Sequence, residues 1–227
     1  MSLARRVVSE GLGTAMLLAV VVGSGIMAER LAGGNVAVAL LSNTVATGAG
    51  LIALILMFGA ISGAHFNPVV TLSQAWQRNL AWREVAPYIT AQLIGAFAGV
   101  AAAHGMFGEP MFLASEHVRT GLSQWWSECV ATFGLVAVII GSSRSRPAVT
   151  PFAVAAYITA AYWFTASTSF ANPAVTLARS VTNTFAGIRP VDTPGFIVAQ
   201  LIGAAAATAV FCWLYSSERL SCRTLDQ

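Results

Sequence analysis

Charged residues are scarce in this sequence. Only 9% of the 227 residues are charged, and the mean hydropathy is +0.71, a composition unlike that of soluble globular domains. The 12 basic residues outnumber the 9 acidic ones, but they are scattered between apolar runs and do not cluster with aromatic residues. This distribution argues against nucleic-acid binding. We therefore expect an integral membrane protein.

Cysteine is also scarce. The three cysteines, Cys129, Cys212 and Cys222, lack metal-ligand spacing, and two of them lie in apolar runs. This pattern argues against a disulfide framework or a zinc site, and we expect neither a metal nor a cofactor. The sequence also shows no convergent set of nucleophile, base and oxyanion-stabilising groups, so we do not expect an enzyme.

Long apolar runs, by contrast, occupy most of the chain. Six can be marked at about 7–28, 36–60, 84–104, 122–142, 150–167 and 194–215. The first lacks a clear small-residue cleavage pattern and is long enough to span a bilayer, so we interpret it as a span rather than a removable signal. Two shorter apolar segments, 68–77 and 173–184, each begin with proline, which suits a first helical turn. The pattern predicts an all-α membrane protein with six transmembrane helices and two half-helices.

The two short segments belong to an internal duplication. The hexapeptide NPVVTL at 67–72 returns as NPAVTL at 172–177, and AQLIGA at 91–96 returns at 199–204. Each half contains three spans, an odd number, so the copies at about 7–104 and 122–215 should be inverted repeats within a single domain of residues 1–227. The half-helices would then meet at mid-bilayer with their positive N-terminal ends. Asn67 and Asn172 would cap these ends and offer amide donors to a passing oxygen.

Arginine placement predicts the orientation. With six spans, both termini lie on one side of the membrane. Eight arginines fall on that side, namely Arg5, Arg6, Arg78, Arg83, Arg144, Arg146, Arg219 and Arg223, and four on the other, namely Arg30, Arg119, Arg179 and Arg189. The positive-inside rule therefore predicts cytoplasmic termini. The short loops suggest a bacterial inner membrane.

Together these motifs resemble the aquaporin and aquaglyceroporin family over essentially the whole chain. The resemblance rests on the two triplets, on the segments 62–66 and 169–171 before them, on the paired glutamates Glu10 and Glu128, and on the repeated AQLIGA. It implies a protomer with its own pore, usually in a homotetramer within the lipid bilayer. The triplets at the centre would be Asn67, Pro68, Val69 and Asn172, Pro173, Ala174.

The resemblance also implies roles for individual residues. Those lining the pore before the triplets would be Gly63, Ala64, His65, Phe66, Thr168, Phe170 and Ala171. Glu10 and Glu128 would brace these loops, and a proton relay is the alternative. His65 would offer a hydrogen bond in the pore, with a pH gate as its alternative.

The narrow filter departs from the family pattern. Counting from the triplets places it at Thr47, Ala160, Ser169 and Val175, where most relatives have arginine at the last position. The four side chains are small and uncharged, so we expect a wide, weakly polar opening without arginine. Arg179 lies one helical turn after Val175. It either lines the outer vestibule or extends toward lipid headgroups.

These observations predict a passive channel for water and small uncharged solutes. A wide filter would admit glycerol-like polyols, urea and neutral metalloid acids such as arsenous acid, with which similar aquaglyceroporins are associated. One alternative is an ion-coupled secondary transporter, since transporters also use inverted repeats and broken helices. The others are a water-selective channel and a structural membrane protein that conducts little.

Overall fold

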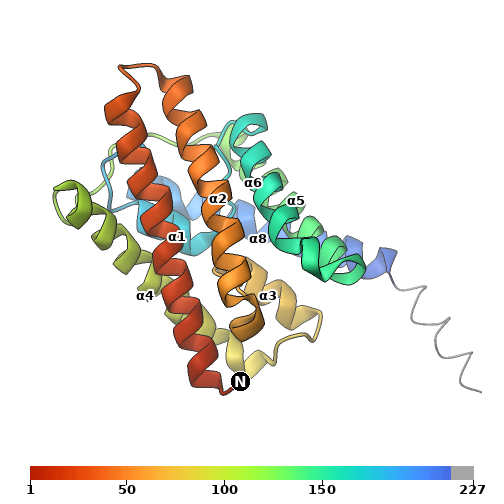
Figure 1. Cartoon of the computed structure of the whole chain (residues 1–227). Helices are drawn as coiled ribbons and strands as arrows, with labels where there is room; N and C mark the ends of the chain where they lie inside the picture. The colour runs from red at the N-terminus through yellow and green to blue at the C-terminus, as the bar shows by residue number, and fades with distance from the viewer. Residues whose placement is uncertain (216–227) are drawn as a thin grey trace, which may run out of the picture.

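The chain is helical throughout the described residues. The computed structural model describes residues 1–215, so Arg219, Arg223 and Cys222 lie outside the described part. Within it there is no strand, and the elements follow in the order α1 (Leu3–Leu31), α2 (Val36–Ser62), α3 (Pro68–Trp76), α4 (Trp82–Phe107), α5 (Leu122–Ser145), η1 (Pro147–Val149), α6 (Thr150–Phe164), α7 (Pro173–Arg179), η2 (Pro190–Asp192) and α8 (Thr193–Leu214) (Figure 1).

Six of these helices have the positions predicted for membrane spans. Among the described residues, α1, α2, α4, α5 and the segment Pro190–Leu214 are long and apolar enough to cross a bilayer. α6 has only 15 residues, a rise of about 22 Å, but η1 directly precedes it and lengthens the path. The predicted all-α fold of six spans and two half-helices is confirmed.

The second half-helix is shorter than predicted. α3 closely follows the expected range, but α7 ends at Arg179 rather than at Thr184. Thr182 and Thr184 instead bond to one another through their hydroxyl groups at 2.9 Å, in a turn beyond the helix. Such side chains compete with helical bonding and favour turns, which explains the early end.

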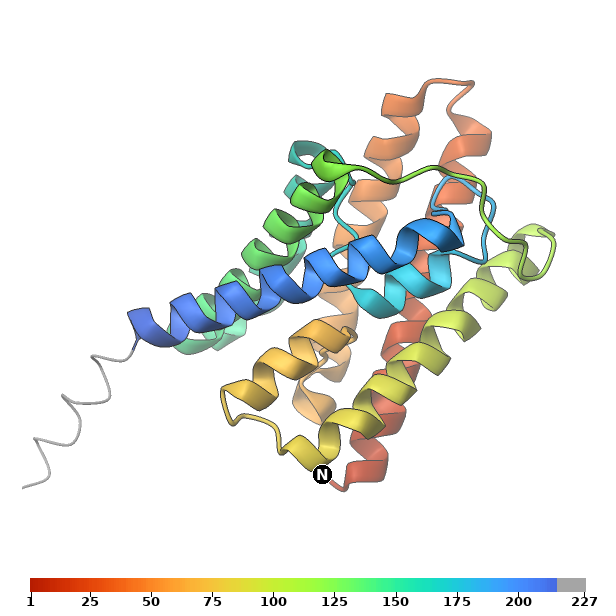
Figure 2. The same cartoon turned by 180° about the vertical axis from the view of Figure 1, so that it is seen from behind.

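The helices form two groups around the short pair. α1 packs against α2 and α4, and α5 packs against α6 and α8. α3 and α7 contact one another and lie between α4 and α8 (Figure 2). The two short helices are therefore held inside the bundle rather than at its surface.

Glycine permits two matched helix crossings. A Cβ on Gly95 would lie 2.1 Å from the carbonyl oxygen of Gly11, and one on Gly203 would lie 2.3 Å from that of Cys129. These distances are shorter than any allowed contact, so only glycine lets α4 approach α1, and α8 approach α5, this closely.

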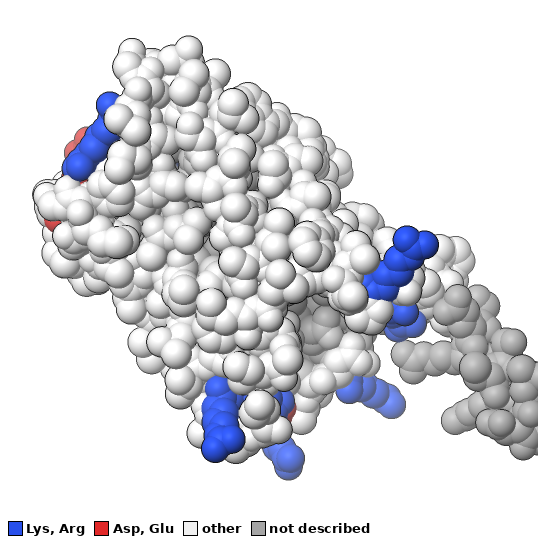
Figure 3. All heavy atoms as spheres, in the orientation of Figure 1, with Lys and Arg blue, Asp and Glu red and all other residues white. Residues whose placement is uncertain are grey.

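The surface matches a membrane environment. On the face shown in Figure 3, charged side chains gather toward the ends of the molecule, and a broad uncharged band separates them. Many large apolar side chains of the described residues are exposed, including Leu56, Ile94, Ile202 and Trp213. Because an exposed apolar surface of this extent is unfavourable in water, it favours contact with lipid or with neighbouring protomers.

Candidate functional site

The loops before the two triplets have unusual backbone conformations. Ala64 and Phe66 have φ values of 50° and 50°, and the corresponding Ser169 and Ala171 have φ values of 51° and 48°. Left-handed conformations cost roughly 1–2 kcal/mol for each non-glycine residue. They persist only where the surroundings hold the backbone in place.

Glu10 holds the first loop. Its carboxylate is fully buried and accepts from the backbone N–H groups of His65 at 3.0 Å and Phe66 at 2.7 Å. It also accepts from the Ser62 hydroxyl at 2.6 Å and the Gln92 amide at 2.8 Å. Four donors offset the cost of burying this charge and fix the loop to α1 and α4.

Glu128 holds the second loop in nearly the same way. It accepts from the N–H groups of Phe170 at 2.8 Å and Ala171 at 2.9 Å, and from the Gln200 amide at 2.6 Å. Gln200 also donates to the Thr176 hydroxyl at 2.9 Å. Gln92 likewise donates to Thr71 at 2.9 Å. These contacts favour a bracing role for both glutamates over a proton relay.

The two asparagines join the halves at the centre. Each caps its own helix: the Asn67 side-chain oxygen accepts from Val69 N–H at 3.1 Å, and that of Asn172 from Ala174 N–H at 3.0 Å. Each side-chain amide then crosses to the other half. Asn67 donates to the Ala171 carbonyl and Asn172 to the Phe66 carbonyl, both at 2.8 Å. An amide nitrogen carries two hydrogens, so one donor on each remains for another partner.

A cavity of about 250 Å³ passes both asparagines. Sequence analysis identified the following residues, all of which line it: Thr47, Gly63, Ala64, His65, Phe66, Asn67, Ser169, Phe170, Asn172, Val175 and Arg179. The other triplet residues, Pro68, Val69, Pro173 and Ala174, are buried in the half-helix starts. A second hollow shares Gly63, His65, Gln74 and Ser143 with this cavity and reaches Arg6 and Arg144. The two hollows therefore extend from the centre toward the end of the molecule that contains the N-terminus.

Three predicted pore residues do not line the cavity. Ala160 is exposed on the outside of α6, and Tyr162 lines the cavity in its place. Thr168 is half-buried, and its hydroxyl accepts from Arg119 Nη1 at 3.4 Å. Ala171 is fully buried, and its carbonyl is the acceptor for Asn67. The prediction for Ala160 is wrong because a two-residue error turns a helical position by about 200°, to the opposite face.

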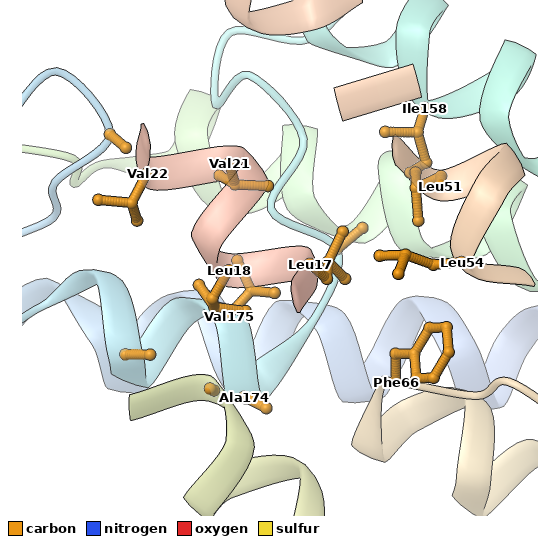
Figure 4. Packing of buried hydrophobic residues seen from close by; sticks show 14 of the residues in the cluster. Leu17, Leu18, Val21, Val22, Leu51, Leu54, Phe66, Ile158, Ala174 and Val175 are labelled. Carbon is orange, nitrogen blue, oxygen red and sulfur yellow. The ribbon is translucent and has the colours of Figure 1, made fainter. Parts of the chain in front are cut away.

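Most of the apolar wall of the cavity is not among the residues predicted from the sequence. Its residues recur at every fourth position along four helices: Leu17 and Val21 on α1, Leu51 and Ile55 after Thr47 on α2, Leu135 and Ile139 before Ser143 on α5, and Val154 and Ile158 between Thr150 and Tyr162 on α6. Figure 4 labels four of the residues that line the cavity, Leu17, Leu51, Ile158 and Val175, within the buried apolar cluster. Four-residue spacing from the predicted pore residue Thr47 could have found Leu51 and Ile55, the part of this wall on α2.

Polar groups interrupt this apolar wall. His65 bonds to the Thr71 hydroxyl at 3.1 Å through Nδ1. The hydroxyl groups of Thr47 and Tyr162 lie 3.4 Å apart. The cavity thus combines apolar helix faces with hydroxyl, imidazole and amide groups, and the described residues that line it include no aspartate or glutamate.

Arg179 is directed inward. It is only 3% exposed and lines the cavity. Its Nε donates to the Ala186 carbonyl, and its Cζ lies 3.4 Å from the centre of the Phe170 ring. Arg119, on the loop before α5, approaches the same ring at 5.1 Å, and burial lowers the pKa of its guanidinium. Arg179 therefore does not extend toward headgroups.

Comparison with known proteins agrees with this geometry. The model of the family described as major intrinsic protein matches residues 1–162 and 146–226. The chain is 56% identical to aquaglyceroporin AqpS of Rhizobium meliloti (strain 1021) over 217 residues, which cover 96% of this chain and 93% of that protein. It is 39% identical to aquaglycerol porin AQY3 of Saccharomyces cerevisiae over 114 residues, 49% of this chain and 17% of that protein.

A solved structure shows the same fold. The X-ray structure of the aquaglyceroporin from Plasmodium falciparum superposes with a TM-score of 0.64, covers 99% of both chains and has 21% sequence identity. At this identity the likeness concerns the fold alone. The family model and the similarity to the Rhizobium protein extend over nearly the whole chain. The chain therefore belongs to the major intrinsic protein family.

Proposed function

We propose that the protein is a passive channel for water and small uncharged solutes such as glycerol and urea. The proteins of this family are channels rather than enzymes. The observation that carries the proposal is the crossed pair of bonds from Asn67 and Asn172 beside the cavity. Each asparagine is held rigidly and keeps one donor for a passing oxygen.

The mixed polar and apolar lining of the cavity suits polyols. A polyol carries hydroxyl groups along a hydrocarbon chain, so it can bond to Asn67, Asn172 and Ser169 while its carbons face the apolar wall. Urea and water can use the same donors. Neutral arsenous acid, a compact centre with three hydroxyl groups, belongs to the same chemical class and is included in the proposed solute range.

The buried carboxylates favour a passive channel over an ion-coupled transporter. Coupling requires a group that binds sodium or a proton at the transport site. Glu10 already accepts four hydrogen bonds and Glu128 accepts three, and neither lines the cavity. A water-selective channel is the other alternative, and it would need a narrower opening than the small residues Thr47, Ser169 and Val175 suggest.

The orientation and assembly are part of the same proposal. The duplicated contacts support one domain built of inverted repeats at about 7–104 and 122–215. We propose a bacterial inner membrane with both termini cytoplasmic, and the positions of Arg6 and Arg144 at the mouth on the N-terminal side support this orientation. The exposed apolar helix faces suit a homotetramer, in which each protomer has its own pore.

Proteoliposome measurements test the proposal. Vesicles containing the purified protein are mixed with hyperosmotic solute, and light scattering records shrinkage by water loss and re-swelling by solute entry. The panel is water, glycerol, urea and arsenous acid, the last followed by direct arsenic measurement. We expect faster flux than in empty vesicles for each, with no accumulation above equilibrium. Accumulation driven by an imposed ion gradient would contradict a passive channel, and flux equal to that of empty vesicles would contradict any channel.

A further inference from the structure

Val175 is uncharged, but Arg179, one turn later on the same half-helix, carries a positive charge. Val175 and Arg179 both line the cavity, four residues apart on one face of α7. Side chains on a helix lean toward its N-terminus, so a long side chain covers the turn before its own Cα. This geometry allows the Arg179 side chain to reach the part of the cavity that Val175 lines.

Two contacts fix this guanidinium beside the cavity. It stacks on Phe170, with 3.4 Å from Cζ to the ring centre, and Phe170 directly follows Ser169. Its Nε donates to the Ala186 carbonyl on the far side of the turn after α7. A planar group held by a ring and a carbonyl keeps one orientation without a bound solute.

The charge of Arg179 is not neutralised by an acid. Within residues 1–215, the ion pairs join Arg6 to Glu84, Arg30 to Glu109 and Arg189 to Asp192, and none includes Arg179. A buried charge without a counterion is costly unless water or polar groups solvate it. The cavity supplies this solvation, and in return its wall carries a positive charge, which repels cations strongly in a low-dielectric setting.

Polar groups near this charge lack partners or face the cavity. Ser169 is 3% exposed and lines the cavity, and its hydroxyl has no hydrogen-bond partner among the described residues. Tyr162, 4% exposed, lines the cavity with its hydroxyl near that of Thr47. Together they provide an aromatic wall and hydroxyl groups at which an uncharged solute can bond.

We propose that Arg179 is the residue that excludes cations in this channel, and that with Tyr162 and Ser169 it forms a charged filter displaced by one helical turn from Val175. The inference rests on the proposed channel function. It replaces the expectation of a filter without arginine. Uncharged solutes can still pass, because the charge of Arg179 lies at the wall of the cavity and the side chain of Val175 is small.

The test compares cation leak with glycerol flux in the same vesicles. The variants are Arg179→Gln, which removes the charge, and Arg179→Lys, which keeps it. The matched control is Arg119→Gln, because Arg119 also lies against Phe170 but does not line the cavity. Sodium entry is followed with a sodium-sensitive dye under an imposed potential, and glycerol flux by light scattering.

We expect Arg179→Gln to raise sodium entry about tenfold or more, where tenfold corresponds to ~1.4 kcal/mol of barrier, with glycerol flux retained. Arg179→Lys and Arg119→Gln should leave sodium entry near the wild-type value. A folded Arg179→Gln protein with wild-type sodium entry, or an equal rise in Arg119→Gln, would overturn the inference. If vesicles with the wild-type protein show no glycerol flux, the proposed channel function is refuted. This outcome is distinct from a wrong assignment of Arg179.

A titratable variant keeps the test valid if Arg179→Gln does not fold. Arg179→His carries a charge well below pH 6.5 and loses it above. Sodium entry through this variant should be low at pH 5.5 and several-fold higher at pH 8, measured in one preparation. The wild type, which retains His65 in the cavity, serves as the control at both values. Equal pH dependence in the two proteins would count against Arg179.

Discussion

Asn67 donates its side-chain amide to the main-chain carbonyl of Ala171 at 2.8 Å, across 104 positions of sequence. The reverse bond, from Asn172 to Phe66, has the same length. The two half-helices are thus tied to each other at their starts by side chains that also cap them. This crossed tie sets the direction of both free amide hydrogens before any solute arrives.

Asn67→Asp should weaken this tie and increase cation entry. The substitution replaces the donor with an oxygen that faces the Ala171 carbonyl, and it adds a negative charge at the centre of the cavity. We expect a loss of ~1–3 kcal/mol in the free energy of unfolding and a several-fold rise in sodium entry. Thermal unfolding in detergent and vesicle flux measure the two effects.

Asn35→Asp is the matched control. Asn35 caps the exposed start of α2, with its side-chain oxygen accepting from Ala37 and Val38, and aspartate caps equally well. This variant should match the wild type in both measurements. If Asn67→Asp also leaves sodium entry and water flux unchanged, Asn67 has no role in permeation.

Much of the centre could be predicted because it depends on local rules. Asparagine before proline indicates a capped helix start, and a repeated buried glutamate needs several donors. Residues 67 and 172 therefore have the predicted positions at the starts of α3 and α7. The sequence does not predict the crossed bonds from each asparagine to the carbonyl before the other, since they depend on how the two loops approach in space.

The filter residues are less predictable from the sequence than the residues at the centre, and the reason is geometric. The count from Asn172 back to Ala160 crosses the irregular segment 165–171, whose path no local pattern specifies. An error of two residues in this count assigns Ala160, which faces outward, to the pore, and it omits Tyr162. The sequence allows two interpretations of Arg179 because the turn from Ser180 to Gly187, which supplies the Ala186 carbonyl, has no pattern that indicates its course.

Val175→Arg should narrow the cavity and affect glycerol more than water. The new side chain would fill part of the cavity beside Leu17. It would also lie one helical turn from Arg179, and like charges at this spacing repel by a few tenths of a kcal/mol. We expect glycerol flux to fall about tenfold, the effect of ~1.4 kcal/mol of barrier, with a smaller decrease in water flux. Stopped-flow light scattering measures both. Equal decreases would show that position 175 does not select by size.

Tyr162→Ala should widen the cavity and admit larger polyols. The ring lines the cavity, and its removal leaves space beside Thr47 and Ser169. We expect sorbitol entry to rise several-fold relative to water flux in vesicles. Ala160→Val is the control, because Ala160 is on the outer face of α6 and its enlargement should leave both fluxes unchanged. A loss of glycerol flux in Ala160→Val would show that Ala160 does belong to the filter.

Glu10→Gln should lower stability. One oxygen of the carboxylate becomes an NH₂ group that faces N–H donors, so at least one of His65, Phe66 and Gln92 loses its acceptor. An unsatisfied buried donor costs ~1–3 kcal/mol, which thermal unfolding should detect. Glu128→Gln should behave alike. A stable Glu10→Gln protein that has lost a wild-type proton flux would instead indicate a proton relay.

Gly95→Ala tests the close crossing of α1 and α4. The new Cβ would lie 2.1 Å from the Gly11 carbonyl oxygen, so the two helices must separate. Overpacking of this kind costs ~1–3 kcal/mol, and we expect a lower unfolding temperature in detergent. Gly203→Ala, opposite Cys129, should have a similar effect. Gly105→Ala is the control in the same helix, because nothing lies within 4 Å of its added Cβ, and alanine favours an exposed helix. If Gly95→Ala were as stable as Gly105→Ala, the helices would tolerate a wider crossing. Glu10, on α1, would then not depend on that crossing to reach Gln92, on α4.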